Sequence, residues 1–260
     1  MPGIAINHCH IAVYDSGNAR LKSREVMSRI AVDLYLGGDL GAWVLDRVEP
    51  GQIRTVVTAE SDLAHLAQAR GHDTCTGAPP VDATSSAIAF SVHYPTILTA
   101  ATLSQYAAAY NLHPGYLPWG RGYYPAFWAL LEGTPAGATL HQMTERLDGG
   151  PIVEQIEVPY SESDTGASLL NRVRIAEKEL FATYWPKVCA GETLRLRPQQ
   201  GVGSYHSRAA FFEVKRPQNW KQMDSETLIR RVRCLTFPGY TGMEIAVGDR
   251  LVHLALQDVT

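Results

Sequence analysis

Short apolar runs alternate with helical patterns over the first 110 residues of the chain. Residues 53–58 (IRTVVT) are rich in β-branched side chains and residues 87–92 (AIAFSV) are apolar, as in buried strands. Residues 60–70 place apolar side chains on one helical face before Gly71, which favours a helix that ends there. Because the strand runs do not alternate with polar residues, both of their faces should be buried. The pattern predicts an α/β fold with a mostly parallel sheet that helices cover on both faces.

Three less regular segments complete the first part of the chain. Residues 11–14 form a short apolar run that predicts a first strand. Residues 23–36 carry apolar side chains at loose helical spacing, and residues 99–109 have the composition of a helix, so both segments are expected to be helical. Strands and helices then follow one another as in doubly wound folds, whose sites lie at the carboxyl ends of the strands.

The second half of the chain adds two strands and a long helix. Residues 137–143 and 151–158 are expected to be strands, separated by a tight turn at residues 148–151. A helix is expected from about residue 167 to residue 190, where apolar side chains recur on one face. Pro186 interrupts that pattern and is expected to kink or restart the helix.

Residues 191–207 are rich in loop-forming residues, and we place a boundary between two parts of the chain there. The larger part, residues 1–195, would hold the sheet, and a small C-terminal subdomain, residues 200–260, would follow it. The subdomain is expected to contain one helix and one β-hairpin. The helix is expected at residues 225–234 and the hairpin strands at residues 243–247 and 250–256, turned at Gly248–Asp249.

Charge and composition narrow the function. The chain has 23 Lys and Arg against 26 Asp and Glu, a formal net charge of -3, whereas a general nucleic-acid binder usually carries a clear basic excess. No apolar run approaches the roughly 18 residues that a membrane-spanning helix needs, and the N-terminus lacks the pattern of a signal peptide. We therefore expect a soluble, cytoplasmic protein without nucleic-acid or membrane partners.

Cysteines and histidines give no pattern of a metal or redox site. The four cysteines lie far apart without CxxC spacing, so buried, reduced thiols are expected. His8 and His10 form a tempting pair, but no carboxylate accompanies them, and no metal is expected. The cysteines are Cys9, Cys75, Cys189 and Cys234.

Residues 110–121 (YNLHPGYLPWGR) carry the most informative chemistry. Asn111 and His113 are two positions apart, so in an extended segment their side chains lie on the same face. An amide can donate a hydrogen bond to an oxygen that gains negative charge, and an imidazole can take a proton from an attacking amine, which together suit acyl transfer. Asp148, at a tight turn, would supply the carboxylate that orients the imidazole. On the residues alone, a Pro- and Gly-rich loop whose Asn and His only satisfy backbone groups explains the pattern equally well.

Residues 111–155 resemble the 10-formyltetrahydrofolate-dependent formyltransferases. That family carries Asn-x-His-Pro, Leu-Pro, Arg-Gly, a Gly-x-Thr-x-His strand and an Asp-x-Gly turn, and all of these elements are present in this order. The segment Gly115-Tyr116, the Arg-Gly-aromatic-aromatic-Pro run and residues 235–240 (LTFPGY) look most like the sugar N-formyltransferases. The matching residues are Asn111, His113, Pro114, Leu117, Pro118, Arg121, Gly122, Gly137, Thr139, His141, Asp148 and Gly150.

This resemblance implies a fold and a reaction. Residues 1–195 would form a Rossmann-like formyltransferase domain with a mostly parallel sheet, and residues 200–260 a small subdomain of helix and β-hairpin. The enzyme would transfer a formyl group from 10-formyltetrahydrofolate, without a metal, to the amino group of a nucleotide-linked amino-dideoxy sugar, commonly dTDP-linked, in the biosynthesis of cell-surface glycans such as lipopolysaccharide. Asn111 would hold the formyl oxygen, His113 would accept the amine proton or stabilise the tetrahedral intermediate, and Asp148 would keep His113 poised.

The resemblance also implies binding residues, several of which have a structural alternative. Aromatic residues at 123–128 recur at helical spacing, as in a hydrophobic core, and Arg121 is as well explained by a structural role as by contact with a phosphate. His141 is first interpreted as a packed, hydrogen-bonded residue, and the arginines at 230–233 as a solvated helix face. The folate would be contacted by Tyr94, Ile97, Leu147 and Asp148, and the substrate by Arg121, Tyr123, Tyr124 and Tyr240.

Two other functions stay open on this sequence. The acceptor could be another small amine, or the chain could be a non-catalytic module that binds a nucleotide sugar or a folate on the same fold. An initiator-tRNA substrate is disfavoured because only about 60 residues follow Gly201 and the chain is net acidic. The apolar hairpin at residues 243–256 could pair with a second copy, so a homodimer is one assembly to expect.

Overall fold

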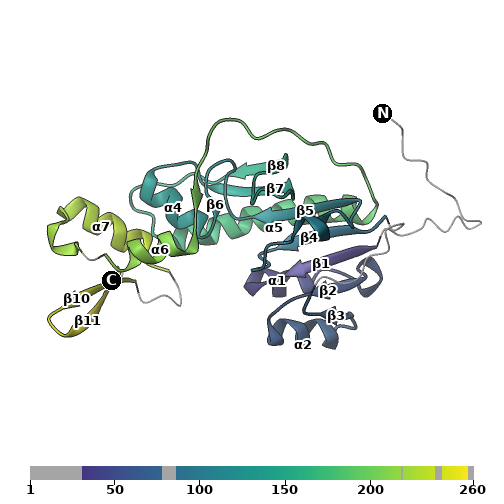
Figure 1. Ribbon diagram of the computed structural model, residues 1–260, viewed down its shortest axis with the longest axis horizontal. Helices are drawn as coiled ribbons and strands as arrows, with labels where there is room; N and C mark the ends of the chain where they lie inside the picture. Colours follow the sequence, from purple (N-terminus) through teal and green to yellow (C-terminus); the bar gives the residue numbers. More distant parts are fainter. Residues whose placement is uncertain (1–30, 78–85, 218, 238–241, 257–260) are drawn as a thin grey trace, which may run out of the picture.

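The computed structural model describes residues 31–77, 86–217, 219–237 and 242–256. Their main feature is a seven-stranded sheet (Figure 1), whose strands in spatial order are β3 (Thr74–Cys75), β2 (Thr55–Val57), β1 (Val32–Leu36), β4 (Ile88–Val92), β5 (Ala108–His113), β7 (Gly137–Gln142) and β8 (Ile152–Glu157). The first five of these strands are parallel, whereas β7 and β8 are antiparallel to their neighbours. The predicted α/β fold with a mostly parallel sheet is therefore confirmed.

Strand β1 shows that the helix expected at residues 23–36 is wrong. All of Val32–Leu36 is buried and pairs in parallel with β2 and with β4. Leu34 belongs to the larger hydrophobic core on one face of the sheet, and Tyr35 to a smaller core on the other face. A strand that is apolar on both faces lacks alternation, so its pattern resembles that of a buried helix. Residues 23–30, the strand expected at 11–14, and Cys9, His8, His10 and Tyr240 lie outside the described residues.

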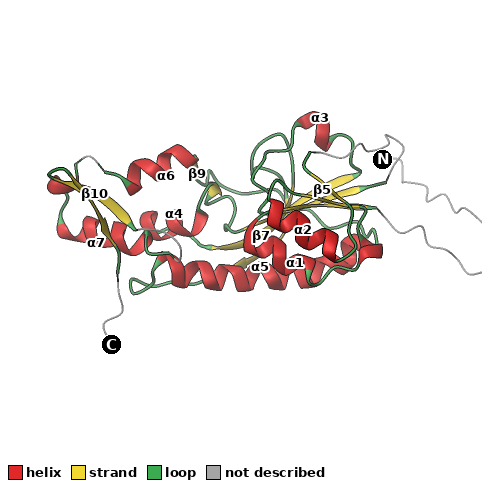
Figure 2. Ribbon diagram, turned by 90° about the horizontal axis from the view of Figure 1, so that it is seen from below, coloured by secondary structure: helices red, strands yellow, loops and turns green. Residues whose placement is uncertain are grey.

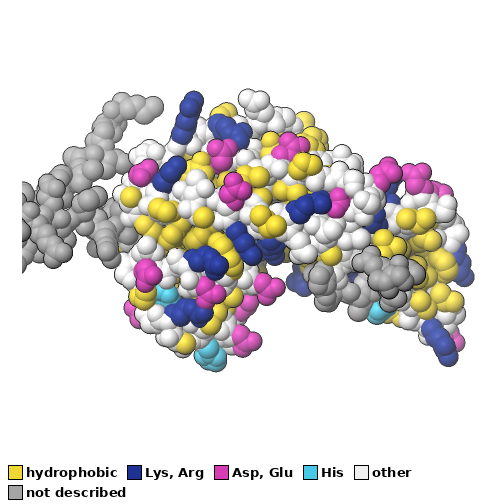
Figure 3. All heavy atoms as spheres, turned by 180° about the vertical axis from the view of Figure 1, so that it is seen from behind, with side chains coloured by type: hydrophobic (Ala, Val, Ile, Leu, Met, Phe, Trp, Pro, Cys, Tyr) yellow, Lys and Arg dark blue, Asp and Glu magenta, His cyan; other side chains and the backbone are white. Residues whose placement is uncertain are grey.

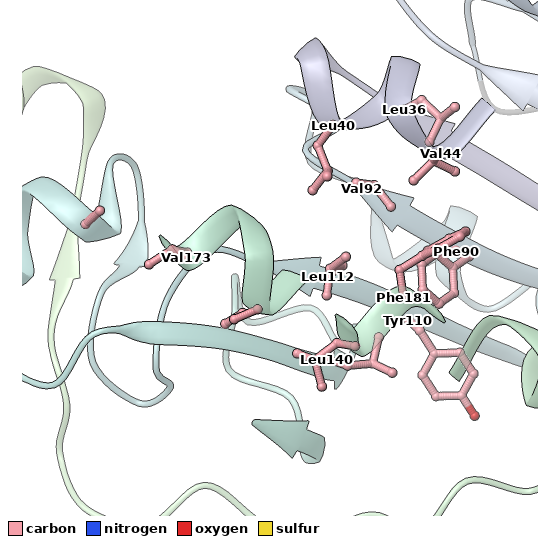
Figure 4. Packing of buried hydrophobic residues seen from close by; sticks show 14 of the residues in the cluster. Leu36, Leu40, Val44, Phe90, Val92, Tyr110, Leu112, Leu140, Val173 and Phe181 are labelled. Carbon is pink, nitrogen blue, oxygen red and sulfur yellow. The ribbon is translucent and has the colours of Figure 1, made fainter. Parts of the chain in front are cut away.

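Helix α5 (Gly166–Cys189) crosses one face of the sheet and packs at the centre of the larger core. A capping box at Thr165 satisfies backbone N–H groups at its first turn. Phe181 of this helix packs edge-to-face on Phe90 of β4, with ring centroids 5.8 Å apart (Figure 4). Trp185 packs on the same Phe90 ring at 5.7 Å. The aromatic cluster therefore fixes α5 against the middle of the sheet.

The other helices of the sheet lie on both sides of it, as predicted. Figure 2 shows α1 (Gly38–Leu45) and α2 (Ser61–Ala69) on the same side as α5, and the short helix α3 (Ala100–Leu103) on the opposite side. The chain leaves β1 toward β2 on one side, whereas β4 pairs with β1 on the other side. Strand order therefore reverses between β1 and β4. In doubly wound folds, ligands bind at the carboxyl ends of strands around such a reversal.

Two predicted helices differ from those observed. Within residues 99–109, only α3 is helical, and Ala108 already pairs with Ile88 as the first residue of β5. Alanine-rich sequence favours a helix locally, but pairing with a buried neighbouring strand overrides that preference. Helix α5 runs on through Pro186 to Cys189, so it does not restart at the proline.

The chain beyond α5 runs back along the sheet before it builds the C-terminal part of the molecule (Figure 1). The expected helix, α7 (Ser225–Cys234), and the expected hairpin of β10 (Met243–Val247) and β11 (Arg250–Leu254) are confirmed. Helix α6 (Arg208–Lys215) was not expected. The division into two domains stays a prediction. The remaining elements are β6 (Arg121–Gly122), α4 (Pro125–Glu132), β9 (Tyr205–His206) and two 3-10 helices, η1 (Pro50–Gln52) and η2 (Trp220–Gln222).

Cys75, Cys189 and Cys234 carry free thiols; Cys234 is buried, as expected, whereas Cys75 and Cys189 are half-buried. Burial raises the pKa of the Cys189 and Cys234 thiols to about 11. Both groups are therefore protonated at neutral pH and act as packing residues rather than as nucleophiles.

Hydrophobic side chains gather on the surface at the C-terminal end of the molecule (Figure 3). Ile229 of α7 and the hairpin residues Val247 and Leu251 are exposed there. The homodimer expected from this hairpin stays a prediction. In the described ranges, no helix combines the length and the apolar character that crossing a membrane requires.

The packing of Phe90 generates a prediction about stability. Phe90 is 0% exposed and contacts the rings of Phe181 and Trp185 of α5. We expect Phe90→Ala to lower the free energy of unfolding by about 3–5 kcal/mol, because the lost burial is joined by a cavity. Urea denaturation measures this change. The control is Ile175→Ala, in helix α5, whose side chain is 63% exposed. This change should alter the free energy of unfolding by no more than about 0.5 kcal/mol.

Candidate active site

Strand β5 presents Asn111 and His113 at its carboxyl end. The two residues are two positions apart in an extended strand, so their side chains share one face of the sheet, as predicted. Neighbours hold the strand on both sides, since Asn111 pairs with Ser91 of β4 and with His141 of β7. His113 is buried, whereas Asn111 is partly exposed. The amide therefore lies where a bound molecule can reach it.

Asp148 reaches the same place from the turn between β7 and β8. Its backbone is left-handed, with a φ of 49°, and its side chain is buried. Oδ2 accepts a hydrogen bond of 2.9 Å from the backbone N–H of Gly122. Oδ1 lies 3.7 Å from Nδ1 of His113 and 3.6 Å from Nε2 of His141. The structure thus brings the three predicted catalytic residues into one cluster.

His141 joins this cluster from β7, directly opposite Asn111. Its Nδ1 lies 2.9 Å from the carbonyl oxygen of Gln142, which only accepts, so this nitrogen carries the hydrogen of the neutral ring. Nε2 then accepts from the amide of Asn111 at 3.2 Å. His141 is therefore hydrogen-bonded and packed, as first interpreted, and it also orients the Asn111 amide.

The hydrogen bonds of His113 define where it can take up a proton. Nε2 lies 2.9 Å from the carbonyl oxygen of Gly120, so Nε2–H is the donor and Nδ1 is the basic nitrogen. Gly115 makes this ring position available, because a Cβ at residue 115 would lie 2.7 Å from Nε2. The basic nitrogen therefore faces the carboxylate of Asp148.

The protonation states of this pair follow from their surroundings. Burial lowers the pKa of the His113 imidazole below its ordinary value, although the Asp148 carboxylate acts in the opposite direction. Burial alone would raise the pKa of Asp148, but the charge that His113 and His141 carry when protonated and the Gly122 N–H outweigh it, and the pKa lies well below its ordinary range. At neutral pH the site therefore holds an ionised carboxylate beside a neutral imidazole.

A polar network supports the chain next to His113. The hydroxyl of Thr139 donates to the carbonyl of Gly115 at 2.6 Å and accepts from the Leu117 N–H at 3.2 Å. The amide of Gln155 donates to the Leu117 carbonyl at 2.6 Å. Sequence reasoning assigned no role to Gln155, whose only signal is a polar residue in a strand beside the Gly-x-Thr-x-His pattern.

The residues expected to contact a folate lie at the end of β4 and in the turn before Asp148. Tyr94 is half-buried and packs on Tyr35, with ring centroids 5.2 Å apart. Ile97 is 60% exposed, and Leu147 is half-buried. These positions leave part of each side chain open to a ligand, and the contacts themselves stay a prediction.

A buried ion pair lies beside this segment and was missed by sequence reasoning. His93, whose φ is 55°, donates from Nε2 to Oε1 of Glu177 at 2.6 Å. Glu177 is 0% exposed on α5, and Arg174 donates to its other oxygen at 3.0 Å. The one signal in the sequence is a carboxylate on the apolar face of the long helix. This cluster fixes the backbone at the carboxyl end of β4.

The residues expected to contact the substrate differ in how far they are exposed and in what they contact. The guanidinium of Arg121 donates to the carbonyls of Val202 and Ser204, which gives it a structural role, and its contact with a substrate phosphate stays a prediction. Tyr124 packs on Phe211, with ring centroids 4.1 Å apart, whereas Tyr123 is 38% exposed. Phe127 and Trp128 are buried, as the helical spacing indicated, and Arg230 pairs with Glu226 on its own helix face.

In the described part of the chain, no group of three or more His, Cys, Asp or Glu side chains is arranged so that it could hold a metal ion.

Comparison with known proteins identifies the family. A sequence profile described as formyl transferase matches residues 44–184, more than half of the chain. The match includes β5, β7 and the Asp148 turn, which carry the cluster. The chain therefore belongs to the formyl transferase family.

Solved structures with the same fold extend this comparison. A sugar N-formyltransferase from Shewanella sp. aligns with a TM-score of 0.73 and 18% identity, over 89% of this chain and 98% of that one. A 4-N formyltransferase from Francisella tularensis gives the same values, with a TM-score of 0.73, 18% identity and coverages of 89% and 98%. An N-formyltransferase from Helicobacter canadensis, in complex with folinic acid and dTDP-3-aminofucose, aligns with a TM-score of 0.66 and 18% identity over 85% of each chain. At these identities the likeness establishes a common fold.

The pKa of His113 gives a prediction that needs no substrate. Asp148 acts to raise this pKa, so Asp148→Asn should lower it further below the ordinary value of about 6.5. We expect the imidazole of the variant to stay neutral to a lower pH than in the unchanged protein. NMR titration of labelled histidine side chains measures the midpoint. An unchanged or raised midpoint for His113 would contradict the geometry described above.

Proposed function

We propose that this protein transfers the formyl group of 10-formyltetrahydrofolate to the amino group of a nucleotide-linked amino-dideoxy sugar, with a dTDP-linked sugar as the expected acceptor. The observation that carries the proposal is the meeting of Asn111, His113 and Asp148 at the carboxyl end of β5. The sugar acceptor is supported by the Gly115-Tyr116 segment of the sequence and by the fold shared with sugar N-formyltransferases. The Helicobacter canadensis protein of this fold holds folinic acid and a dTDP-amino sugar together, which supports both substrates.

The residues fit a formyl donor at this site. The donor supplies a carbonyl carbon bound to nitrogen, whose oxygen gains negative charge when an amine attacks. Asn111 has two amide N–H groups, of which one meets His141 and the other can donate to that oxygen. Because the strand holds the amide in place before the reaction, its dipole stabilises the charge without reorganisation.

His113 and Asp148 handle the proton of the attacking amine. As the nitrogen bonds to the formyl carbon, Nδ1 of His113 takes its proton, and the imidazolium is stabilised by Asp148 at 3.7 Å. The same proton then passes to the folate nitrogen as its bond to the formyl carbon breaks. The products are the formamide of the sugar and tetrahydrofolate. His113 ends neutral, as it began.

The acceptor would approach from the side of β6. A cavity of about 260 Å³ is lined there by Arg121, Arg146 and Gln199 among others. Two guanidinium groups on one small cavity suit an anionic group such as a sugar diphosphate. Tyr123, which is 38% exposed, keeps its proposed role in the sugar pocket, and so does Tyr240, which lies outside the described residues.

The assay that tests the proposal uses the whole chain. It is incubated with 10-formyltetrahydrofolate and each member of a panel of dTDP- and GDP-amino sugars, and release of tetrahydrofolate is followed. We expect turnover with at least one dTDP-amino sugar. Turnover only with another small amine would move the acceptor outside nucleotide sugars. Tight binding of a nucleotide sugar without turnover of any amine would favour the non-catalytic module.

Removal of the base gives a second test of the mechanism. His113→Asn should lower the rate of formyl transfer by about 10²–10⁴-fold with little loss of stability, because the amine proton has no acceptor. Steady-state kinetics measures the rate and thermal unfolding the stability. His65→Asn, an exposed histidine on α2, is the matched control and should retain the full rate. A rate above about a tenth of the original in His113→Asn would remove this residue from the proposed role.

A further inference from the structure

The segment that leaves α5 binds tightly to the part of the chain that carries the site. We call residues 197–206 the strap. It runs back past the sheet and ends with the two residues of β9 (Figure 1). At its start, Arg197 exchanges backbone hydrogen bonds of 2.7 and 2.8 Å with Ile152 of β8. Near its end, the hydroxyl of Ser204 accepts from the N–H of Gly120 at 2.8 Å. The strap is therefore attached on both sides of the catalytic cluster.

Two close backbone approaches show how little space separates the strap from the site. A Cβ at Gly203 would lie 2.1 Å from the carbonyl oxygen of Pro118, and a Cβ at Gly122 would lie 2.3 Å from that of His206. Both glycines have positive φ, at 63° and 90°. Gly122 is the residue whose N–H binds Asp148, so the strap contacts the backbone that holds the catalytic carboxylate.

Gln199 is the strap residue that reaches the Asp148 turn itself. Its side-chain amide donates to the carbonyl of Asp148 at 2.7 Å and to that of Gly150 at 2.8 Å. An amide nitrogen has two hydrogens, so these two bonds use both. The bonds therefore clamp the turn on either side of Gly149.

The turn needs such support because of its backbone. Asp148 is held in the left-handed region, which is uncommon for residues other than glycine and which aspartate adopts when local hydrogen bonds support it. Its Oδ1 must lie near two imidazoles at once, at 3.6 and 3.7 Å. A small rotation of the turn would move the carboxylate toward one ring and away from the other.

We propose that Gln199 is a positioning residue for formyl transfer, which sets the Asp148 turn so that the carboxylate faces His113. The proposal rests on the function proposed above, but its geometric part can be tested without turnover. Gln199 touches no reacting atom. Because it also lines the cavity proposed for the acceptor, the titration of His113 without substrate is the readout that isolates its effect on Asp148. The charged and titratable side chains that act on this carboxylate are His113 of β5, His141 of β7 and Arg121 of β6. Glu177 of α5 acts on His113, and Arg146 of the turn acts on Arg121.

The test replaces Gln199 with an uncharged residue of similar size. Gln199→Leu removes both donors and adds no charge near the imidazoles. We expect the titration midpoint of His113 to fall toward its value in Asp148→Asn, because Asp148 no longer supports the imidazolium. We also expect kcat to fall about 10–10²-fold with little change in the KM for the folate, since the proton acceptor is misplaced rather than removed. NMR titration and steady-state kinetics give the two readouts.

Two comparisons separate positioning from a general structural effect. Gln200→Leu is the matched control, because Gln200 is the exposed neighbour in the strap and should change neither readout. In the Asp148→Asn background, Gln199→Leu should shift the His113 midpoint no further, because the residue through which it acts is gone. If Gln199→Leu does not fold, Gln199→Asn, whose shorter amide cannot reach both carbonyls, should give a smaller change in the same direction.

The outcomes distinguish this proposal from the proposed function. An unchanged His113 midpoint in folded Gln199→Leu overturns the proposal, whether or not kcat falls. An equal shift in Gln200→Leu, or an additive shift in the double variant, overturns it too. If the unchanged protein formylates no amine, the proposed function fails, and the titration still decides whether Gln199 sets the Asp148 turn.

Discussion

The site depends on keeping one buried carboxylate charged. Burial opposes the charge of Asp148, and the fold offsets this with the Gly122 N–H and with two imidazoles from different strands, which favour the charge in their protonated forms. Each of these groups acts on Asp148 only at short distance, so β5, β7 and the turn have to be held in a fixed arrangement. Burial also keeps His113 neutral, because it lowers the pKa of the imidazole. Once the ring has accepted a proton, the neighbouring carboxylate stabilises it.

A second buried carboxylate links the hydrophobic core to the site. Glu177 lies on the face of α5 that packs on the sheet, where an unpaired charge would be strongly destabilising. His93 and Arg174 pair with it, and the helix that supplies the core also holds the carboxyl end of β4. The segment expected to bind the folate is thereby tied to a helix that packs in the larger hydrophobic core, which limits its movement.

Local sequence was sufficient where spacing alone decides geometry. Asn111 and His113 share a face because an extended strand requires it, and the hairpin of β10 and β11 follows from its apolar runs and turn. Contacts between distant segments could not be predicted in this way. The strand β1 looks helical because it is buried on both faces. Gln199 lies 51 residues along the chain from its partner Asp148, and Glu177 lies 84 residues from its partner His93. Among the sequence observations, only the resemblance to the formyltransferases indicated that residues far apart along the chain, such as His113 and Asp148, lie together.

The register between β5 and β7 restricts how the length of this chain can change. These strands pair without a break from Tyr110 with Gln142 to His113 with Thr139, which sets the amide of Asn111 opposite the ring of His141. Deleting or inserting one residue in either strand would turn its side chains to the other face and disperse the cluster. Between β7 and β8, by contrast, a bulge beside His141 already accommodates an extra residue. Length variation among related enzymes should therefore accumulate on the β8 side of the sheet and be excluded from the pair that holds the amide and the imidazole.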